Sequence, residues 1–283
     1  MKANLRSKES LHVSLVLIGL GLLGIVQAVV FADKDGYLYF GTLVGKCCAV
    51  LFYGWLSLAI CSFCVASKAD CYVSSDYTPD YASEREIEIA KGALDGAVSW
   101  QQRWEENGDP VRWCKRCNAF RPPRAHHCAV CDKCVDCMDH HCGWVGNCIG
   151  KQNLKAFLLC LMYVSLCLLF SCVSVFVEAF IYLKKHRVVW VFVLLLLLAL
   201  VMGAVLLVLV IGVMLDQVAL LLENITRVEE RVLDCASAEM VKETGRMMRL
   251  RNHFDMGAKA NVRAVFESPW LFPTVPRKDN KTD

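Results

Sequence analysis

The sequence has few of the residues that define several protein classes. Only 7 of its 283 residues are Pro and 17 are Gly, so a collagen-like or low-complexity chain is excluded. Charged residues make up 21% of the chain and the formal net charge is only +3, which gives no electrostatic indication of nucleic-acid binding. Hydrophobic residues reach 56%, above the roughly 45–50% of soluble domains, and this composition excludes a disordered chain.

Cysteine, in contrast, is abundant, with 17 residues. In a secreted protein this number would indicate a disulfide framework. Many of these cysteines cluster between positions 114 and 148 at spacings typical of metal ligands, which favours a reducing compartment.

Four segments are apolar over the length of about 20 residues that a bilayer span requires: 11–32, 45–66, 154–183 and 188–215. The first has a longer apolar run than a signal peptide, so we expect a retained anchor. The sequence predicts an all-α membrane protein in which a Cys-rich domain of short strands and loops separates the second and third of four transmembrane helices. The expected units are 1–66, 67–153, 154–216 and 217–283.

The distribution of basic residues predicts the orientation of these spans. Four spans place both termini and the long loop 67–153 on the same side of the membrane. All but five of the 31 Lys and Arg residues lie in these segments or directly beside the loop. The other five are Lys34, Lys46, Lys184, Lys185 and Arg187. Because positive charge concentrates on the cytosolic side of membrane proteins, we expect the termini and the Cys-rich domain to be cytosolic.

The stretch 114–148 predicts metal binding. Structural zinc takes four Cys or His ligands in a closed tetrahedron, and a Cys-x2-Cys turn brings two sulfurs to one ion. Two zinc sites would use eight ligands, which leaves four candidates spare, and spacing alone does not say which. The candidates are Cys114, Cys117, His126, His127, Cys128, Cys131, Cys134, Cys137, His140, His141, Cys142 and Cys148.

A spare thiol beside a spare imidazole provides the groups needed for nucleophilic catalysis. In an extended strand, residues two apart point the same way, so His140 and Cys142 would share one face while His141 points toward a metal. Asp139 can orient His140 only if the chain turns between them. On spacing alone, Cys142 as a zinc ligand is a nearly equal alternative.

These residues resemble a known family. Asp139-His140-His141-Cys142 in its Cys-rich frame is similar to the DHHC protein S-acyltransferases, or palmitoyltransferases. The similarity covers 114–157 closely, and the four-span layout fits it as well. It includes Arg121-Pro122-Pro123-Arg124, Trp144, Asn147-Cys148-Ile149-Gly150 and Asn153, and, in the C-terminal part, Phe254-Asp255-Met256-Gly257, Asn261 and the segment 270–273.

The resemblance implies specific roles. One zinc ion is held by Cys114, Cys117, His127 and Cys134, and a second by Cys128, Cys131, His141 and Cys148. Cys142 is the nucleophile, His140 its base, and Asp139 orients the base. Arg121, Arg124 and His126 lie near the phosphates of coenzyme A, and Trp144 contacts coenzyme A or anchors at the membrane interface. Independently of the resemblance, we expect Asn261 to be a buried polar residue that holds the C-terminal segment to the spans by hydrogen bonds.

The reaction of the family has two steps. A cysteine thiolate takes the acyl group from a fatty acyl-coenzyme A such as palmitoyl-coenzyme A, and a cytosolic cysteine of a membrane-associated substrate protein then accepts it. The family resides by default in Golgi or endoplasmic reticulum membranes, and no nucleic acid takes part. The alternative is a catalytically weak, zinc-bearing membrane adaptor that binds partner proteins.

Three positions depart from the family pattern. Gly143 replaces the Pro that usually follows the nucleophile, and we expect it to loosen the turn. Asp70-Cys71-Tyr72 replaces Asp-Pro-Gly. Arg227 occupies the second Thr position of Thr-Thr-x-Glu, where its side chain would pair with Asp139 or disturb it.

Overall fold

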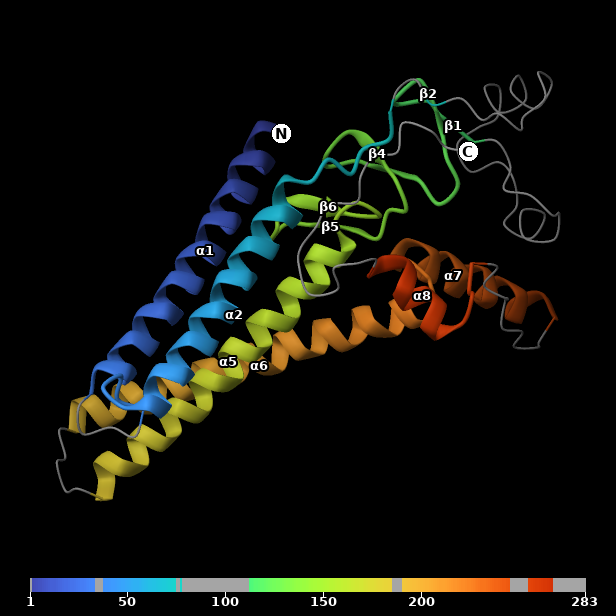
Figure 1. The fold of residues 1–283 in the computed structure, drawn as a ribbon. Helices are drawn as coiled ribbons and strands as arrows, with labels where there is room; N and C mark the ends of the chain where they lie inside the picture. Colours follow the sequence, from blue (N-terminus) through green and yellow to red (C-terminus); the bar gives the residue numbers. More distant parts are fainter. Residues whose placement is uncertain are drawn as a thin grey trace.

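The computed structural model describes residues 2–33, 38–74, 77, 112–184, 190–244 and 254–266 (Figure 1). These residues form mainly long helices, with a region of short strands between the second and third of the apolar helices. The segment 270–273 of the family resemblance, and most of the loop between 67 and 114, lie outside the described residues.

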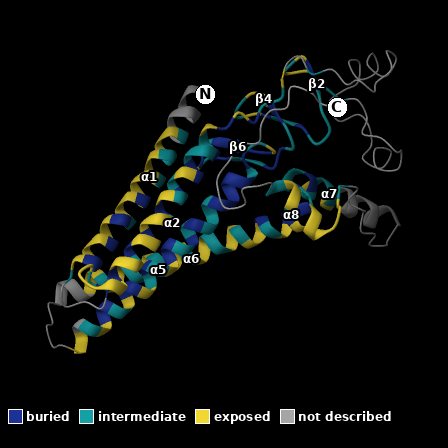
Figure 2. Cartoon of the chain, viewed as in Figure 1, coloured by how far each residue is buried: buried dark blue, intermediate teal, exposed yellow. Residues whose placement is uncertain are grey.

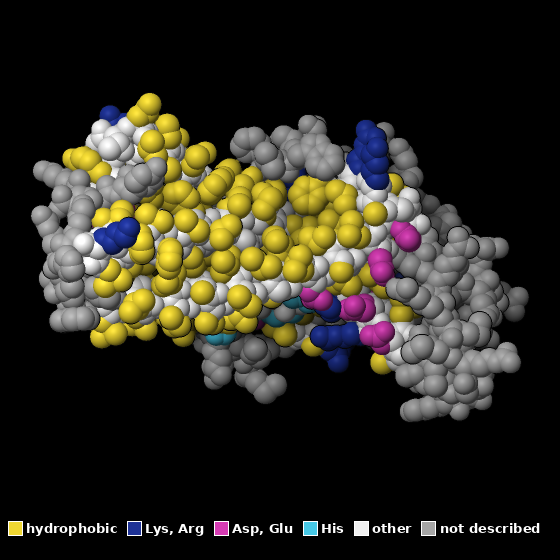
Figure 3. Space-filling view, turned by 90° about the horizontal axis from the view of Figure 1, so that it is seen from below, with side chains coloured by type: hydrophobic (Ala, Val, Ile, Leu, Met, Phe, Trp, Pro, Cys, Tyr) yellow, Lys and Arg dark blue, Asp and Glu magenta, His cyan; other side chains and the backbone are white. Residues whose placement is uncertain are grey.

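Four helices are long and apolar enough to cross a membrane, as predicted. They are α1 (Lys2–Ala32), α2 (Leu43–Lys68), α5 (Leu154–Lys184) and α6 (Trp190–Leu222). Their apolar windows are Glu9–Ala32, Leu43–Lys68, Leu154–Ile181 and Leu194–Leu222. Large apolar side chains such as Leu198 and Val208 stay more than half exposed, and Figure 3 shows a face of the bundle covered by hydrophobic side chains. An exposed apolar surface of this size suits lipid rather than water.

The fourth helix is longer than predicted. It continues past 215 to Leu222 because the apolar pattern resumes and its polar residues find partners. Asp216 forms an ion pair with Arg227, and Gln217 is buried and hydrogen-bonds Asp139. The expected span ended at about 215, whereas the apolar window of this helix runs to Leu222.

The bundle core lies between α1, α2 and α5. Phe31, Phe52 and Phe170 meet there with ring centroids 5.6–6.5 Å apart, and Phe52 is fully buried. Figure 2 shows buried residues on the facing sides of these helices and exposed residues on their outer sides. These three helices thus pack through their inward faces and leave their outer faces apolar.

The Cys-rich region consists of three antiparallel hairpins. The strands are β1 (Arg112–Cys114) with β2 (Ala119–Arg121), β3 (His126–Cys128) with β4 (Lys133–Val135), and β5 (His140–Cys142) with β6 (Asn147–Ile149). Two-stranded hairpins of three residues per strand are not stable alone in water. Their fold must come from metal ligands and from contacts with the helices.

Two asparagines attach the third hairpin to α2. Asn147 donates its side-chain amide to the carbonyl oxygens of Ala66, Ser67 and Ala69, at 2.9–3.2 Å. Asn153 also donates to Ala66, at 2.9 Å. These bonds satisfy the free carbonyls at the C-terminal end of α2, which otherwise would lack partners. The C-terminal end of α2 therefore fixes the position of β5 and β6.

The segment after α2 packs beneath the second hairpin. Cys71 is 1% exposed, in an apolar cluster with Cys128, Val135 and Met138. The next residue, Tyr72, forms an isolated antiparallel bridge with Val135. The departure from Asp-Pro-Gly thus supplies apolar side chains to the base of the hairpins.

Two further helices extend the C-terminal part: α7 (Arg227–Thr244) and α8 (Ala258–Val265). Asn261 is buried, donates to the carbonyl of Leu222 at 2.8 Å and accepts the backbone N–H of Met256 at 3.0 Å. It holds the C-terminal segment to the end of α6, as predicted. Figure 1 shows α7, α8 and the strands at the same end of the bundle.

Candidate active site and metal centres

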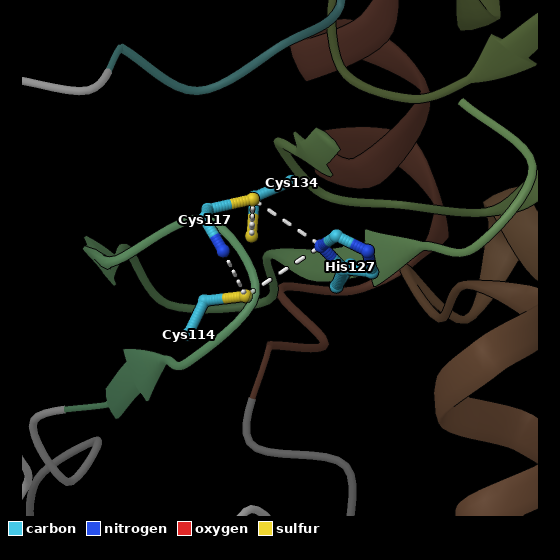
Figure 4. Close-up of side chains that lie close together, drawn as sticks. All are labelled: Cys114, Cys117, His127 and Cys134. Atoms are coloured by element: carbon cyan, nitrogen blue, oxygen red, sulfur yellow. Dashed lines mark hydrogen bonds between the residues drawn. The ribbon is translucent and has the colours of Figure 1, made fainter. Parts of the chain in front are cut away.

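The first cluster of metal-binding side chains unites the first two hairpins. Cys114 ends β1 and Cys117 lies in the turn that leads to β2, while His127 and Cys134 face each other across β3 and β4. The Nδ1 atom of His127 lies 3.5 Å from the Cys114 sulfur and 3.2 Å from the Cys117 sulfur. Figure 4 shows the four side chains converging on one point.

The second cluster has the same composition and unites the second and third hairpins. Its members are Cys128, Cys131, His141 and Cys148. The Nδ1 atom of His141 lies 3.4–3.7 Å from the three sulfurs, and the sulfurs of Cys131 and Cys148 are 3.4 Å apart. His141 and Cys148 are partners in the register of β5 and β6.

The two quartets fit tetrahedral zinc. A Zn–S bond of about 2.3 Å in tetrahedral geometry places ligand sulfurs roughly 3.8 Å apart. The observed sulfur separations are 3.7 Å for Cys117 and Cys134 and 3.4 Å in the second cluster. In each cluster all four donor atoms lie within 4.8 Å of one another. Three thiolates and one imidazole form a closed donor set, typical of structural rather than catalytic zinc.

Strand geometry explains why the quartets interleave. Successive side chains in a strand point to opposite faces, so His127 reaches the first cluster while its neighbour Cys128 reaches the second. The same alternation in β5 turns His141 toward the second cluster and leaves His140 and Cys142 on the other face. Cys142 belongs to neither quartet.

Cys142, His140 and Asp139 lie together outside the clusters. The Nδ1 atom of His140 is 2.7 Å from Oδ2 of Asp139. The other carboxylate oxygen, Oδ1, accepts the backbone N–H of Arg227 at 2.7 Å. Asp139 precedes β5, and its own N–H donates to the carbonyl of Ile149 at 2.9 Å. This chain turn before the strand lets the aspartate reach His140.

The electrostatics of these three groups favour an ionised thiol. Burial acts to raise the pKa of Cys142, but hydrogen bonding from His140 and from the backbone N–H groups of Val145 and Trp144 outweighs it and lowers the pKa below its ordinary value. Burial lowers the pKa of His140, whereas Asp139 and Cys142 raise it, to about 9. The pair therefore favours thiolate and imidazolium at neutral pH.

Cys137, the other cysteine of 114–148 that belongs to neither quartet, has a pKa shifted in the opposite direction from that of Cys142. Burial raises the pKa of the Cys137 thiol to about 12, so it stays protonated at neutral pH. Cys137 thus offers a chemical contrast to Cys142 within the same region.

The departures after Cys142 and at Arg227 leave this arrangement intact. A Cβ atom at Gly143 would meet only His12, at 3.8 Å, and the turn is closed by a bond from the N–H of Gly146 to the carbonyl of Cys142. The glycine that the turn requires is Gly146, with a φ of +67°. We expected Gly143 to loosen this turn, but the hydrogen bond that closes the turn is formed.

Arg227 contacts Asp139 through its backbone only. Its guanidinium forms ion pairs with Glu230, at 2.8 Å, and with Asp216. The expectation of a side-chain pair with Asp139 was therefore wrong, because closer carboxylates on α6 and α7 hold the arginine. The backbone N–H at the start of a helix is a suitable donor to a carboxylate, because it lacks an intrahelical partner.

The N-terminus of α7 is fixed by a capping box. The hydroxyl of Thr226 accepts the N–H of Glu229 at 3.3 Å, and the Glu229 carboxylate accepts the N–H of Thr226 at 2.8 Å. Glu229 also forms a two-point ion pair with Arg124, at 2.7 and 2.8 Å. Sequence reasoning missed this pair, although the Thr-x-x-Glu pattern itself indicates the capping box.

The four residues expected to contact coenzyme A differ from one another in their surroundings. Arg124 donates to Glu229 and Asn224 and stacks on Phe254, so its charge is directed to the C-terminal segment instead of an open phosphate site. Arg121 and His126 lie on β2 and β3, paired in register with Arg112 and Val135. Trp144 is 64% exposed in the turn after Cys142, where an aromatic contact with a ligand has room.

The fold and the site define a class: a protein of four apolar helices with two Cys3His metal-binding clusters and a separate cysteine–histidine–aspartate set. Comparison with known proteins gives the family. Residues 107–233 match the family model of the DHHC palmitoyltransferase. This match confirms the resemblance deduced from the Cys/His pattern of the segment.

The curated relatives carry related names. The chain is 43% identical to human palmitoyltransferase ZDHHC14 over 111 residues, which are 37% of this chain and 22% of the relative. It is 36% identical to probable protein S-acyltransferase 14 of Arabidopsis thaliana over 154 residues, 53% of this chain and 50% of the relative. Bovine palmitoyltransferase ZDHHC9 is 45% identical over 97 residues, 31% and 26% of the two chains. The chain thus spans half or less of these relatives.

We predict that the purified chain binds two zinc ions. Replacing Cys131 with Ser removes a ligand of the second cluster only, so the zinc content should fall from two ions to one per chain, measured by atomic emission. The Cys137→Ser variant, which changes neither quartet, should keep two. Equal zinc content in the Cys131→Ser variant and the unmodified chain would contradict this assignment.

We also predict that Arg124 secures the C-terminal segment. Breaking its largely buried pair with Glu229 by Arg124→Met should cost about 3 kcal/mol of local stability in α7 and α8, since the Glu229 carboxylate loses its charged partner. Hydrogen exchange of these helices measures the loss. Arg227→Met, which breaks more exposed ion pairs, should cost less than about 1 kcal/mol. Equal effects of the two variants would refute the assignment.

Proposed function

We propose that the chain is a protein-cysteine S-palmitoyltransferase with Cys142 as its acyl carrier. The observation that carries this proposal is that Cys142 lies outside both metal quartets while facing a histidine that is held by a carboxylate. A thiol placed in this way is an activated nucleophile, whereas a zinc-bound thiolate would be occupied. The names of the relatives support the same activity.

In the first step, the Cys142 thiolate attacks the carbonyl carbon of a fatty acyl-coenzyme A thioester. A bond forms between the Cys142 sulfur and the acyl carbon, and the bond to the sulfur of coenzyme A breaks. The leaving thiolate takes a proton from the His140 imidazolium. Asp139 keeps the ring oriented through its bond to Nδ1, which leaves the other nitrogen for proton transfer.

In the second step, a cysteine thiol of a substrate protein gives its proton to neutral His140 and attacks the acyl group on Cys142. The new thioester forms and the Cys142 thiolate is released. Each step exchanges one thioester for another, so the reaction requires no further energy source. The two zinc ions of the quartets would hold the hairpins in shape and take no part in these steps.

The membrane setting follows from the position of Cys142. Its apolar neighbours include Phe63 and Ala66 of α2 and Phe157 of α5, at one end of the apolar helices. An acyl chain beside these helices leaves water, which is favourable by about 0.8 kcal/mol for each methylene. We propose that this end faces the cytosol of Golgi or endoplasmic reticulum membranes, which agrees with basic termini and 17 free cysteines.

We predict that palmitoyl-coenzyme A labels the full chain at a single thioester. The label should be released by hydroxylamine, be lost completely in Cys142→Ser, and persist in Cys137→Ser, which removes a neighbouring thiol of high pKa. Mass spectrometry of the labelled peptide checks the position. A hydroxylamine-sensitive label of undiminished size in Cys142→Ser would refute the proposal. Absence of label on a zinc-loaded chain would favour the adaptor.

We predict that His140→Ala slows the labelling step by about 10²–10⁴-fold, which is the usual contribution of general acid–base catalysis. The zinc content should remain at two ions, because His140 points away from the second cluster. Stopped-flow measurement of coenzyme A release gives the rate. A rate equal to that of the unmodified chain would exclude His140 from proton transfer.

A further inference from the structure

The N-terminal half of α1 contacts the hairpin that carries Cys142. Glu9, His12, Val13 and Val16 follow helical spacing and share one face of α1. The ring of His12 lies 5.3 Å from that of Trp144, and Val13 and Val16 pack against the apolar cluster that includes Cys142. The first membrane helix therefore contacts the site as well as the bundle.

The polar contact on this face joins Glu9 to a predicted zinc ligand. Oε1 of Glu9 lies 2.8 Å from Nε2 of His141, and both side chains are largely buried, at 17% and 16% exposed. The opposite ring nitrogen, Nδ1, faces the three sulfurs of the second cluster. If Nδ1 binds the metal, the ring proton is on Nε2, and this N–H donates a hydrogen bond to Glu9.

The first cluster lacks an equivalent contact within the described residues. The Nε2 atom of His127 lies 3.6 Å from Oδ1 of Asp132, beyond the usual length of a hydrogen bond, and Asp132 is 52% exposed. Nε2 of His127 has no hydrogen-bond partner among the described residues. Among the described residues, the two quartets are similar in composition, but only the second has a largely buried carboxylate within hydrogen-bond distance of its histidine.

We propose that Glu9 is a positioning residue for the second metal site and couples α1 to the strand that carries the nucleophile. A carboxylate behind a metal-bound histidine fixes its tautomer and ring orientation and raises its basicity. His141 stands between His140 and Cys142, so its ring orientation also fixes the backbone that presents them. This inference rests on the zinc assignment of the proposed function.

The test compares zinc release from the two sites in the full-length protein. Loss of such an outer carboxylate typically weakens metal binding about 10–100-fold. In Glu9→Ala, a chelator should therefore expose the second-site cysteines Cys128, Cys131 and Cys148 to alkylation about 10–100-fold faster, as mapped by mass spectrometry. The first-site cysteines should react at the unmodified rate. Glu9→Gln, which keeps an acceptor oxygen, should restore much of the protection.

Asp132→Asn is the matched control at the first site, and we expect no change in either set of cysteines. Unchanged zinc release from the second site in Glu9→Ala would overturn the inference. Equal acceleration of zinc release at both sites, with no rescue by Glu9→Gln, would also overturn it, because that result indicates only loosened packing. An unmodified chain that binds fewer than two zinc ions would instead refute the zinc assignment itself.

Discussion

The alternation of side chains along three-residue strands is the constraint on which the site depends. In β3 it sends His127 and Cys128 to different metal quartets, and in β5 it turns His141 away from His140 and Cys142. A shift of one residue in the register of β5 and β6 would exchange the two faces and turn the nucleophile toward the metal. In the proposed function, metal binding by the two quartets would therefore fix the register and with it the cysteine that stays outside them.

Such short hairpins cannot hold this register alone, and the membrane helices supply the rest. Asn147 and Asn153 bind the carbonyls at the end of α2, while Asp139 accepts the first N–H of α7. The same bonds that orient the catalytic groups also satisfy helix ends that would otherwise lack partners. These contacts hold Cys142 beside one end of the apolar helices.

The sequence predicts local features of this site well and distant ones poorly. Hydropathy over about 20 residues and the Cys-x2-Cys spacing are properties of neighbouring residues, so the four apolar helices and the metal-binding stretch follow directly. The membership of each quartet needed the family resemblance. The partners of Arg124 and His141 lie 105 and 132 residues away, at Glu229 and Glu9. A single charged residue before an apolar run gives no signal that distinguishes a positioning carboxylate from a solvated one.

The departures from the family pattern show which groups around Asp139 and Cys142 depend on the identity of a side chain and which depend only on the backbone. Asp139 uses a backbone N–H of α7, which any residue at position 227 supplies, so the arginine there can direct its charge to Asp216 and Glu230. A side chain at position 143 would meet only an ordinary contact with His12, whereas Gly146 closes the turn with a positive φ. The substitutions thus fall where side chains are not needed by the catalytic set. A change that moved the N-terminus of α7, such as loss of the capping pair Thr226 and Glu229, would affect Asp139 more than any change of the Arg227 side chain.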